Sequence, residues 1–361
     1  MTTSIGWTWV PDGKGETKTG ETWNPQVGCL SVSPACHNCY AAGQAHRSSG
    51  DKPMVKQHHG LTKQAKDKDG KQLLDAEGRK LPPHWNGQVN RVPHLLAQPL
   101  HWRDPRGVFV CSMSDLFFDV GSEDACRWIA AIFGIMAACP QHTFMVLTKR
   151  PVNAAKWFAW VDAQAKGMED EAAPTRVCMG MAVDALAGDL ATPAVRDRIR
   201  LAMRHDDLAW PLPGVWVGVT AEDQKHADLR VPVLLELPAA VRFVSYEPAC
   251  GPVDWTRIKW PGRESTVDVL RGGSWDLDPA FGFIQHSDMA TLDWLIAGGE
   301  SGPGARPMNP DWARSARDQC EAAGVAYYFK QVGAWSFDGS NVGAKLAGRE
   351  LDGRTWDGFP E

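Results

Sequence analysis

Six short apolar runs recur along the chain and decide which folds are open to it. They read VFVC at 108–111, FMVL at 144–147, VWVGV at 215–219, RFVSY at 242–246, WLIAG at 294–298 and AYYFKQ at 326–331. None alternates strictly between apolar and polar residues, which is typical of strands covered on both faces of a parallel sheet. We therefore expect six buried strands, with a seventh, weaker one within TWNPQVG at 22–28.

Helical patterns separate these runs. One begins at Ser122, a predicted N-cap; another has Asn309 as its cap, Pro310 at the first helical position and Gly324 as its end; a third follows Thr220. Strands that alternate with helices form βα units and a parallel sheet. We predict an α/β protein with a TIM-like (β/α) barrel, complete or partial, of six to eight parallel strands.

The barrel is expected to form a single domain over residues 1–361. Segments 51–95 and 253–290 are polar and punctuated by Gly and Pro, so we interpret them as insertions or loops. A hydrophobic content of 43% can fill a substantial core.

Charge and hydropathy narrow the possible partners. The net charge of −5 gives no overall basic field, so a nucleic acid would have to meet a local patch, such as the Lys-rich segment from Lys52 to Lys80 with His84, Trp85 and Arg91 after it. A loop that is merely solvated is the simpler interpretation of that segment. The N-terminus lacks a signal-peptide pattern, and no run approaches the roughly 20 apolar residues of a membrane span. We expect a cytoplasmic protein, in the host cytoplasm if phage-encoded, with no membrane partner.

Each apolar run ends in a compact polar cluster. In a parallel barrel these strand ends converge on one mouth, where active sites lie. A single cluster often only begins a loop, but six together indicate a site. The clusters contain Asp115, Lys149 with Arg150, Glu222 with Asp223, Glu247, Glu300 with Ser301, and Lys330 with Gln331.

Three of the nine cysteines, Cys29, Cys36 and Cys39, follow the spacing C-x6-C-x2-C. The odd total and the missing signal peptide favour reduced thiols, and thiolates bind iron–sulfur clusters or zinc. A structural zinc site needs four protein ligands, and His37 or His46 could supply the fourth. Three cysteines without a fourth ligand suit a four-iron cluster whose remaining iron is open to a small molecule.

The motif and several further blocks carry a resemblance to a known family. The triplet, which ends C-x-x-C-Tyr before a helix, resembles that of the radical SAM superfamily, although the usual spacing there is C-x3-C-x2-C. The wider set resembles a phage and prophage branch with an elongated three-cysteine motif. The blocks are TWNPQVGC, SPACHNCYA, SMSDLFFD, LTKRP, SYEP, GGESGPGARPM and YFKQVG, between residues 22 and 333.

This resemblance implies two cofactors. A [4Fe-4S] cluster would be held by Cys29, Cys36 and Cys39, and S-adenosylmethionine would bind its open iron and give a 5′-deoxyadenosyl radical. Superfamily members often hold the methionine amino group with a Gly-Gly-Glu segment after the second strand, whereas GGE stands at 298–300 here. Ser112, Ser114 and Asp115 occupy the strand end that corresponds to the usual position, so we predict that they hold the methionine end. Tyr40, Gly298 and Gly299 are further predicted contacts with the cofactor.

Other residues are candidates for contacts with the substrate. Lys149 and Arg150 could meet a carboxylate or phosphate. Glu247 could bind ribose hydroxyls or an amine, and Trp23 and Trp85 are candidate stacking platforms. The predicted catalytic residues are Lys149, Glu247 and Glu300.

The resemblance also implies a reaction. We expect rearrangement or another modification of a nucleobase substituent, with amino-acid-modified thymidine in phage DNA as the example, and flavodoxin or ferredoxin as electron donor. A repair lyase resembling spore photoproduct lyase is one alternative. The others are a zinc-binding nucleic-acid-binding protein without catalysis and a barrel hydrolase using Glu222, Glu247 or Glu300 as acid and base.

Overall fold

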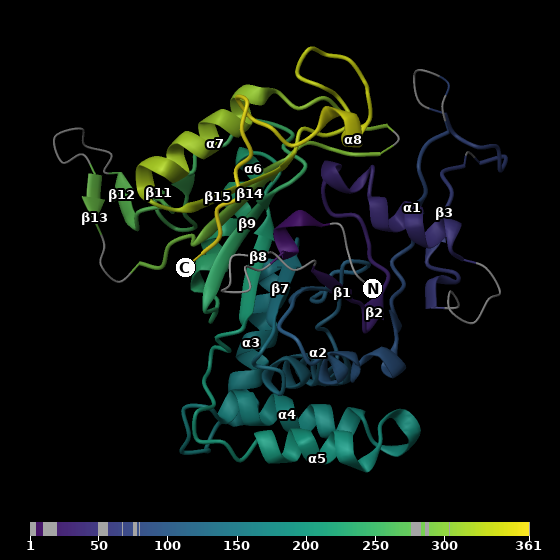
Figure 1. Cartoon of the computed structure of the whole chain (residues 1–361), viewed down its shortest axis with the longest axis vertical. Coiled ribbons are helices and arrows are strands. Elements are labelled where there is room, and N and C mark those ends of the chain that lie inside the picture. The colour runs from purple at the N-terminus through teal and green to yellow at the C-terminus, as the bar shows by residue number, and fades with distance from the viewer. Residues whose placement is uncertain are drawn as a thin grey trace.

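A seven-stranded sheet, parallel throughout, forms the centre of the molecule (Figure 1). The computed structural model describes residues 5–9, 20–49, 57–66, 68–74, 78, 80–275, 283–285, 289–302 and 304–360. The sheet curls into a half-barrel, which confirms the predicted partial (β/α) barrel. Its strands, in spatial and chain order, are β1 (Glu21–Trp23), β6 (Gly107–Val110), β7 (Thr143–Thr148), β8 (Val215–Thr220), β9 (Val241–Tyr246), β14 (Trp294–Gly298) and β15 (Ala326–Gln331).

Helices cover one face of this sheet. α2, α3, α6 and α7 pack near the strands, while α4 packs on α2 and α5 on α4 as further layers (Figure 1). The helices are α1 (Tyr40–Arg47), α2 (Glu123–Ala137), α3 (Pro151–Ala165), α4 (Ala173–Ala185), α5 (Pro193–Ala202), α6 (Gln224–Glu236), α7 (Pro310–Ala323) and α8 (Ala344–Ala347), with 3₁₀ turns η1 (Gly6–Thr8), η2 (Pro34–Cys36), η4 (Pro93–Leu95), η5 (Gln98–His101) and η6 (Gly188–Leu190).

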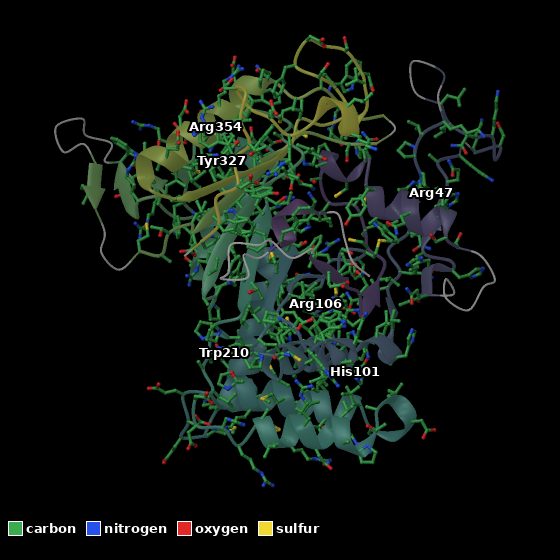
Figure 2. All side chains as sticks on the ribbon, in the orientation of Figure 1. Arg47, His101, Arg106, Trp210, Tyr327 and Arg354 are labelled. Carbon is green, nitrogen blue, oxygen red and sulfur yellow. The ribbon has the colours of Figure 1, made fainter. Side chains whose placement is uncertain are left out.

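The predicted caps form as expected. The Ser122 hydroxyl accepts the backbone N–H of Ala125, and Asn309 accepts that of Asp311. Gly324 ends α7 with φ of 73°, a left-handed conformation that glycine adopts without strain. Tyr327 ties the same helix to the sheet, since its hydroxyl donates to a carbonyl of α7 (Figure 2).

The two faces of the sheet carry different cores because side chains alternate along each strand. Those facing the helices, such as Val146 and Val244, belong to the main core. Those on the concave face form a separate, mostly aromatic cluster that includes Phe243 and Trp294. Both ends of the described chain close this face: Trp7 packs on Phe109 at 4.8 Å between ring centroids, and Phe359 packs on Trp294 at 5.1 Å.

The two predicted insertions hold short strands where they are described. β3 (Thr62–Lys63) pairs with β4 (His84–Trp85), and β5 (Asn90–Arg91) pairs with β2 (Gln26–Val27). Segment 253–290 carries a four-stranded antiparallel sheet of β10 (Ile258–Lys259), β11 (Thr266–Asp268), β12 (Gly273–Trp275) and β13 (Phe283–Gln285). The single-domain assignment stays a prediction, and Lys52 lies outside the described residues. In the described part of the chain, none of the helices has the length and apolarity that crossing a membrane requires.

Candidate functional site

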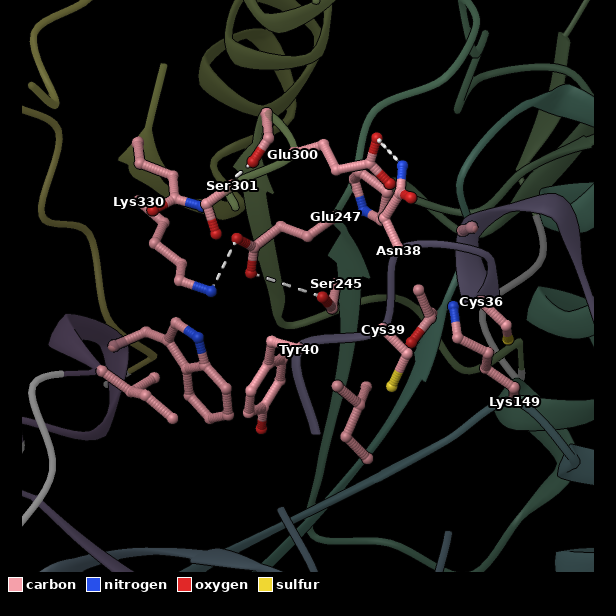
Figure 3. A pocket seen from close by; sticks show the side chains of 18 of the residues that line it. Cys36, Asn38, Cys39, Tyr40, Lys149, Ser245, Glu247, Glu300, Ser301 and Lys330 are labelled. Carbon is pink, nitrogen blue, oxygen red and sulfur yellow. Dashed lines mark hydrogen bonds and ion pairs between the residues drawn. The ribbon is translucent and has the colours of Figure 1, made fainter. Parts of the chain in front are cut away.

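A cavity of about 220 Å³ lies where the strands of the half-barrel end (Figure 3). Most of the predicted polar clusters meet here, as their places at carboxyl ends of parallel strands require. Lys149 follows β7, Glu247 follows β9, Glu300 follows β14 and Lys330 is the last residue but one of β15. All four line the cavity. The three predicted catalytic residues are therefore brought to one place.

Alternation along the strands decides which side chains reach the cavity. Ser245 on β9, and Glu247 directly after this strand, are two and four positions from Phe243, so their side chains point to the same face of the sheet. Phe243 lies in the concave aromatic cluster, and Ser245 and Glu247 line the cavity. Leu147 on β7 follows the same rule. The aromatic cluster therefore forms the floor of the cavity, and the last residues of the strands form its walls.

The three cysteines lie on the loop that leads from β2 into α1. All three are half-buried free thiols, with Cys36 ending η2 and Cys39 preceding α1. Together they line a second cavity of about 160 Å³, and Cys36 and Cys39 also line the first one. The two cavities adjoin, because they share seven lining residues, Cys36, Cys39, Tyr40, Phe109, Leu147, Lys149 and Thr220.

Glu222 anchors the cysteine loop from the end of β8. Its side chain is 1% exposed; Oε1 accepts a hydrogen bond of 2.8 Å from Ser33 and is paired with Lys149, and Oε2 accepts one of 2.9 Å from Arg230. Burial by itself would raise the pKa of Glu222, but Lys149 and Arg230 outweigh it and hold the pKa below its usual value. A carboxylate with so many donors has a structural role that its sequence position does not reveal.

Glu300 anchors the same loop from the end of β14. Arg306 Nε and Nη2 each lie 2.9 Å from its carboxylate oxygens, and Asn38 donates at 3.1 Å to Oε2. Burial again acts to raise the pKa, and the hydrogen bonds from Arg306 lower it below the usual value. Asn38, between Cys36 and Cys39 in the sequence, is thus held against the strand ends (Figure 3).

Glu247 has fewer hydrogen-bond donors around its carboxylate than Glu222 and Glu300 have. Lys330 Nζ lies 2.9 Å from its Oε1, and the Ser245 hydroxyl is 3.5 Å from Oε2. Both Glu247 and Lys330 line the larger cavity, and Figure 3 shows them apart from Cys36 and Lys149.

The predicted cofactor contacts at the end of β6 line the smaller cavity and make bonds within the protein. Ser112 donates to Asn24, and Ser114 donates to the carbonyl of Gly28. Asp115 accepts the hydroxyl of Thr148 at 2.7 Å and the backbone N–H of Lys149 at 2.9 Å. Asp115 therefore fixes the start of the loop after β7.

Gly298 and Gly299 are needed for close approach. A Cβ on Gly299 would lie 2.0 Å from the carbonyl oxygen of Val332, and one on Gly298 would lie 2.8 Å from Glu247 Oε1. Gly299 lines the larger cavity. Gly299 therefore requires glycine for packing against backbone, whatever ligand the cavity takes, whereas a side chain at 298 would displace the carboxylate of Glu247.

Of the predicted aromatic contacts, Tyr40 lines the cavities and Trp23 does not. Tyr40 begins α1, lines both cavities and donates to the carbonyl of Ser112 at 2.8 Å. Trp23 is fully buried and donates its indole N–H to Leu95 in the main core, so its prediction as a stacking platform was wrong. Its parity on β1 turns it toward the helices. Trp85 is also buried, but it lines the smaller cavity.

The histidines near the motif lie elsewhere. His37 and His46 are exposed, the His46 ring lies 3.1 Å from the Thr62 hydroxyl, and both cavities are lined by cysteines and by neither histidine. Among the described residues, no three His, Cys, Asp or Glu side chains surround a single point as ligands of one metal ion would. In a four-iron cluster each thiolate binds a different iron, so three cluster ligands need not share one centre.

Several residues of the site were missed from the sequence. Ser33, Asn38, Arg230 and Arg306 bond to the two buried carboxylates. Ser33 and Asn38 stand inside the cysteine motif, which was a usable signal, whereas no local pattern marks the two arginines. Cys111, a buried thiol directly after β6, also lines the smaller cavity, with φ of 57°, a strained conformation for its type.

Fold and site together define an α/β half-barrel protein whose cavities lie at the carboxyl ends of its strands, against a three-cysteine loop. The chain belongs to the family described as Protein of unknown function (DUF5131), whose model matches residues 16–360. Comparison with curated proteins and with solved structures gave no match.

Proposed function

We propose that this protein is a radical SAM enzyme with a [4Fe-4S] cluster on Cys29, Cys36 and Cys39 and S-adenosylmethionine at the open iron. One observation carries the proposal: three free thiols from one loop line a cavity at the carboxyl-end mouth of a parallel half-barrel. Such mouths are where barrel enzymes bind their ligands.

The donor set fits the cluster. Three soft thiolate ligands stand together, and the nearby histidines that would complete a zinc site line neither cavity. Burial raises the pKa of Cys29 to about 12, so the free thiol holds its proton and binding of a metal cluster would release it. When bound, the cluster supplies an electron that cleaves S-adenosylmethionine and yields a radical able to take hydrogen from an unactivated carbon.

The chain's own residues position the ligands and exclude water. Glu222 and Glu300 hold the cysteine loop against the sheet through Ser33 and Asn38. Apolar side chains, Phe109 among them, line the wall that both cavities share and keep bulk water from the reacting atoms. Tyr40 stands at the same wall, where its ring can pack on the nucleoside of the cofactor.

The proposed substrate is a nucleobase substituent, with amino-acid-modified thymidine as the example, and flavodoxin or ferredoxin as electron donor. The larger cavity, of about 220 Å³, has room for a small group and not for a duplex. A base in DNA would therefore have to leave the stack to reach it, at a cost of a few kcal/mol.

Anaerobic purification tests the proposal. We expect about four irons and sulfides per chain, a brown chromophore, and release of 5′-deoxyadenosine from S-adenosylmethionine with dithionite. Cys36→Ala should abolish both the iron and the cleavage. The matched control is Cys250→Ala, which replaces a half-buried thiol outside both cavities. This variant should keep both the iron and the cleavage of S-adenosylmethionine. Stoichiometric zinc with no chromophore and no cleavage would instead show a structural zinc site.

A further inference from the structure

We infer that Glu247 and Lys330 form a subsite for a substrate group that carries both an ammonium and a carboxylate, as an α-amino acid does. The inference rests on the proposed function and names what its substrate presents to the cavity. Glu247 takes the ammonium and Lys330 takes the carboxylate.

Three carboxylates near the cavity differ in how well the protein satisfies them. Glu222 has donors from Ser33, Lys149 and Arg230, and Glu300 has Arg306 and Asn38. The Glu247 side chain is nine-tenths buried, yet within the described part of the chain its Oε1 accepts no hydrogen bond. Its contact with Lys330 at 2.9 Å is an ion pair that lacks hydrogen-bond geometry. Among the residues that the structure describes, its Oε2 accepts only from the Ser245 hydroxyl, at 3.5 Å.

Such a pair is poorly explained as a device for stability. Burying the Glu247 charge costs several kcal/mol unless hydrogen bonds satisfy it, and Lys330, whose side chain is 28% exposed, contacts it without hydrogen-bond geometry. Buried polar groups left unsatisfied in a native structure call for another explanation, and a ligand supplies one. An ammonium at Glu247 and a carboxylate at Lys330 would replace one imperfect ion pair by two charge-assisted hydrogen-bonded contacts.

The sheet is shaped to hold this pair. Glu247 follows β9 and Lys330 lies on β15, so the ion pair spans the end of β14, which stands between them. Gly298 ends β14, and a Cβ there would come within 2.8 Å of Glu247 Oε1. A side chain at 298 would crowd the carboxylate, so glycine at this position leaves room for the pair and its ligand.

The methionine end of S-adenosylmethionine also carries an ammonium and a carboxylate. The position of the Glu247–Lys330 pair in the cavity therefore has to show whether the pair binds the cofactor or the substrate. That end must reach the open iron beside the cysteines. The smaller cavity, which all three cysteines line, is lined by neither Glu247 nor Lys330, whereas Cys36 and Cys39, but not Cys29, also line the larger cavity that holds the pair. Figure 3 shows the pair at one end of the larger cavity, away from Cys36 and Lys149. We therefore assign the pair to the substrate.

Calorimetry on the anaerobic, cluster-loaded protein without reductant tests the assignment. The probes are thymidine, 5-aminomethyl-2′-deoxyuridine, 5-carboxymethyl-2′-deoxyuridine and the 5-aminomethyl nucleoside N-substituted with a carboxymethyl group, which carries both charges. The wild type should bind the doubly charged probe most tightly. Glu247→Gln should weaken the binding of the two amine-bearing probes about tenfold, a change of about 1.4 kcal/mol in binding free energy. It should leave the binding of the carboxymethyl probe unchanged. Lys330→Met should weaken the two carboxylate-bearing probes and spare the amine alone.

Lys345→Met, at an exposed lysine of α8, is the matched control and should change none of these affinities. Equal weakening of all four probes, or no weakening, would show that the pair is structural and overturn the inference. Weaker binding of S-adenosylmethionine with unchanged nucleoside binding would overturn it as well, in favour of the cofactor. Iron content is measured on the same samples, and S-adenosylmethionine cleavage on separate portions given dithionite. Absence of both refutes the proposed function, while the probe pattern is still read on the iron-free protein.

Discussion

Ser33 and Asn38, two small polar residues inside the cysteine motif, bond to carboxylates 189 and 262 positions further along the chain. Each bond joins the loop of thiols to the end of a strand in the half-barrel. The thiols themselves contribute little to fixing that loop: Cys36 Sγ lies 3.7 Å from the Ser33 hydroxyl, a weak contact. We interpret Ser33 and Asn38 as the residues that position the cysteines before any metal binds.

Replacing Ser33 by alanine should therefore destabilise the protein. A hydrogen bond to a charged group contributes about 1.5–3 kcal/mol, and Ser33 is buried where it meets Glu222. Urea unfolding should show a loss in this range. Ser31→Ala, in the exposed part of the same loop, should stay within about 0.5 kcal/mol. Equal stability of the two variants would mean that the Ser33 bond does not anchor the loop.

Glu222 should make stability depend on pH. Because its pKa is lower in the folded than in the unfolded chain, ionised Glu222 stabilises the fold fully above the unfolded value of about 4.3. That contribution is lost as the pH falls through the lower, folded pKa. Glu222→Gln removes this contribution and leaves Lys149 and Arg230 without a carboxylate partner. We expect the free energy of unfolding to fall by about 3–5 kcal/mol near neutral pH.

The measurement is urea unfolding of wild type and Glu222→Gln at neutral and at acid pH. The difference in the free energy of unfolding should be largest at neutral pH and shrink below pH 4. Glu236→Gln, at an exposed acid that ends α6, is the control and should show little difference at either pH. A difference that persists unchanged into acid would refute the role given to the ionised form.

Within the sheet, Gly218 of β8 lies against a ring of β9. A Cβ at this position would come within 2.5 Å of the Phe243 ring, which forms part of the aromatic floor beneath the cavity. Gly218→Ala should therefore cost about 1–3 kcal/mol, as overpacking of a core does, and lower the melting temperature. Gly180→Ala, in helix α4 with open space at the Cβ, should stabilise by about 0.5–1 kcal/mol. The same sign for both variants would contradict this packing.

The sheet strands and several capped helices could be predicted because their signals are local. The apolar runs of β6 and β15 are covered on both faces, and Ser122 and Asn309 cap helices with their own side chains. The α4–α5 layer was not predicted. Its helix α4 packs so closely on α2 that a Cβ on Gly134 would meet the carbonyl of Cys178 at 2.1 Å, a contact between separate elements that no single segment shows.

For the whole molecule, the sequence predicted where the site lies but not how its residues pair. Polar clusters at the ends of parallel strands had to converge, and they do. Which carboxylate anchors the loop and which faces the cavity depends on partners such as Arg230 and Arg306, which lie on a helix and a loop with no distinguishing pattern. The alternation of side chains along β1 points Trp23 away from the site, but this follows only once the position of β1 in the sheet is known.

The two ends of the described chain close the concave face of the half-barrel, so the stability of the fold should depend on Phe359, close to the C-terminal end of the described residues. Phe359 packs on Trp294 and Tyr328, and the neighbouring carbonyl of Gly358 accepts the indole N–H of Trp294. Phe359→Ala should cost about 1–2 kcal/mol, less than full burial of such a ring would contribute, because the ring is half-buried; urea unfolding and a change in tryptophan fluorescence measure the loss. Phe337→Ala, at an exposed ring of the same C-terminal segment, should cost much less. If both variants unfold at the same urea concentration, the C-terminus does not close the concave face.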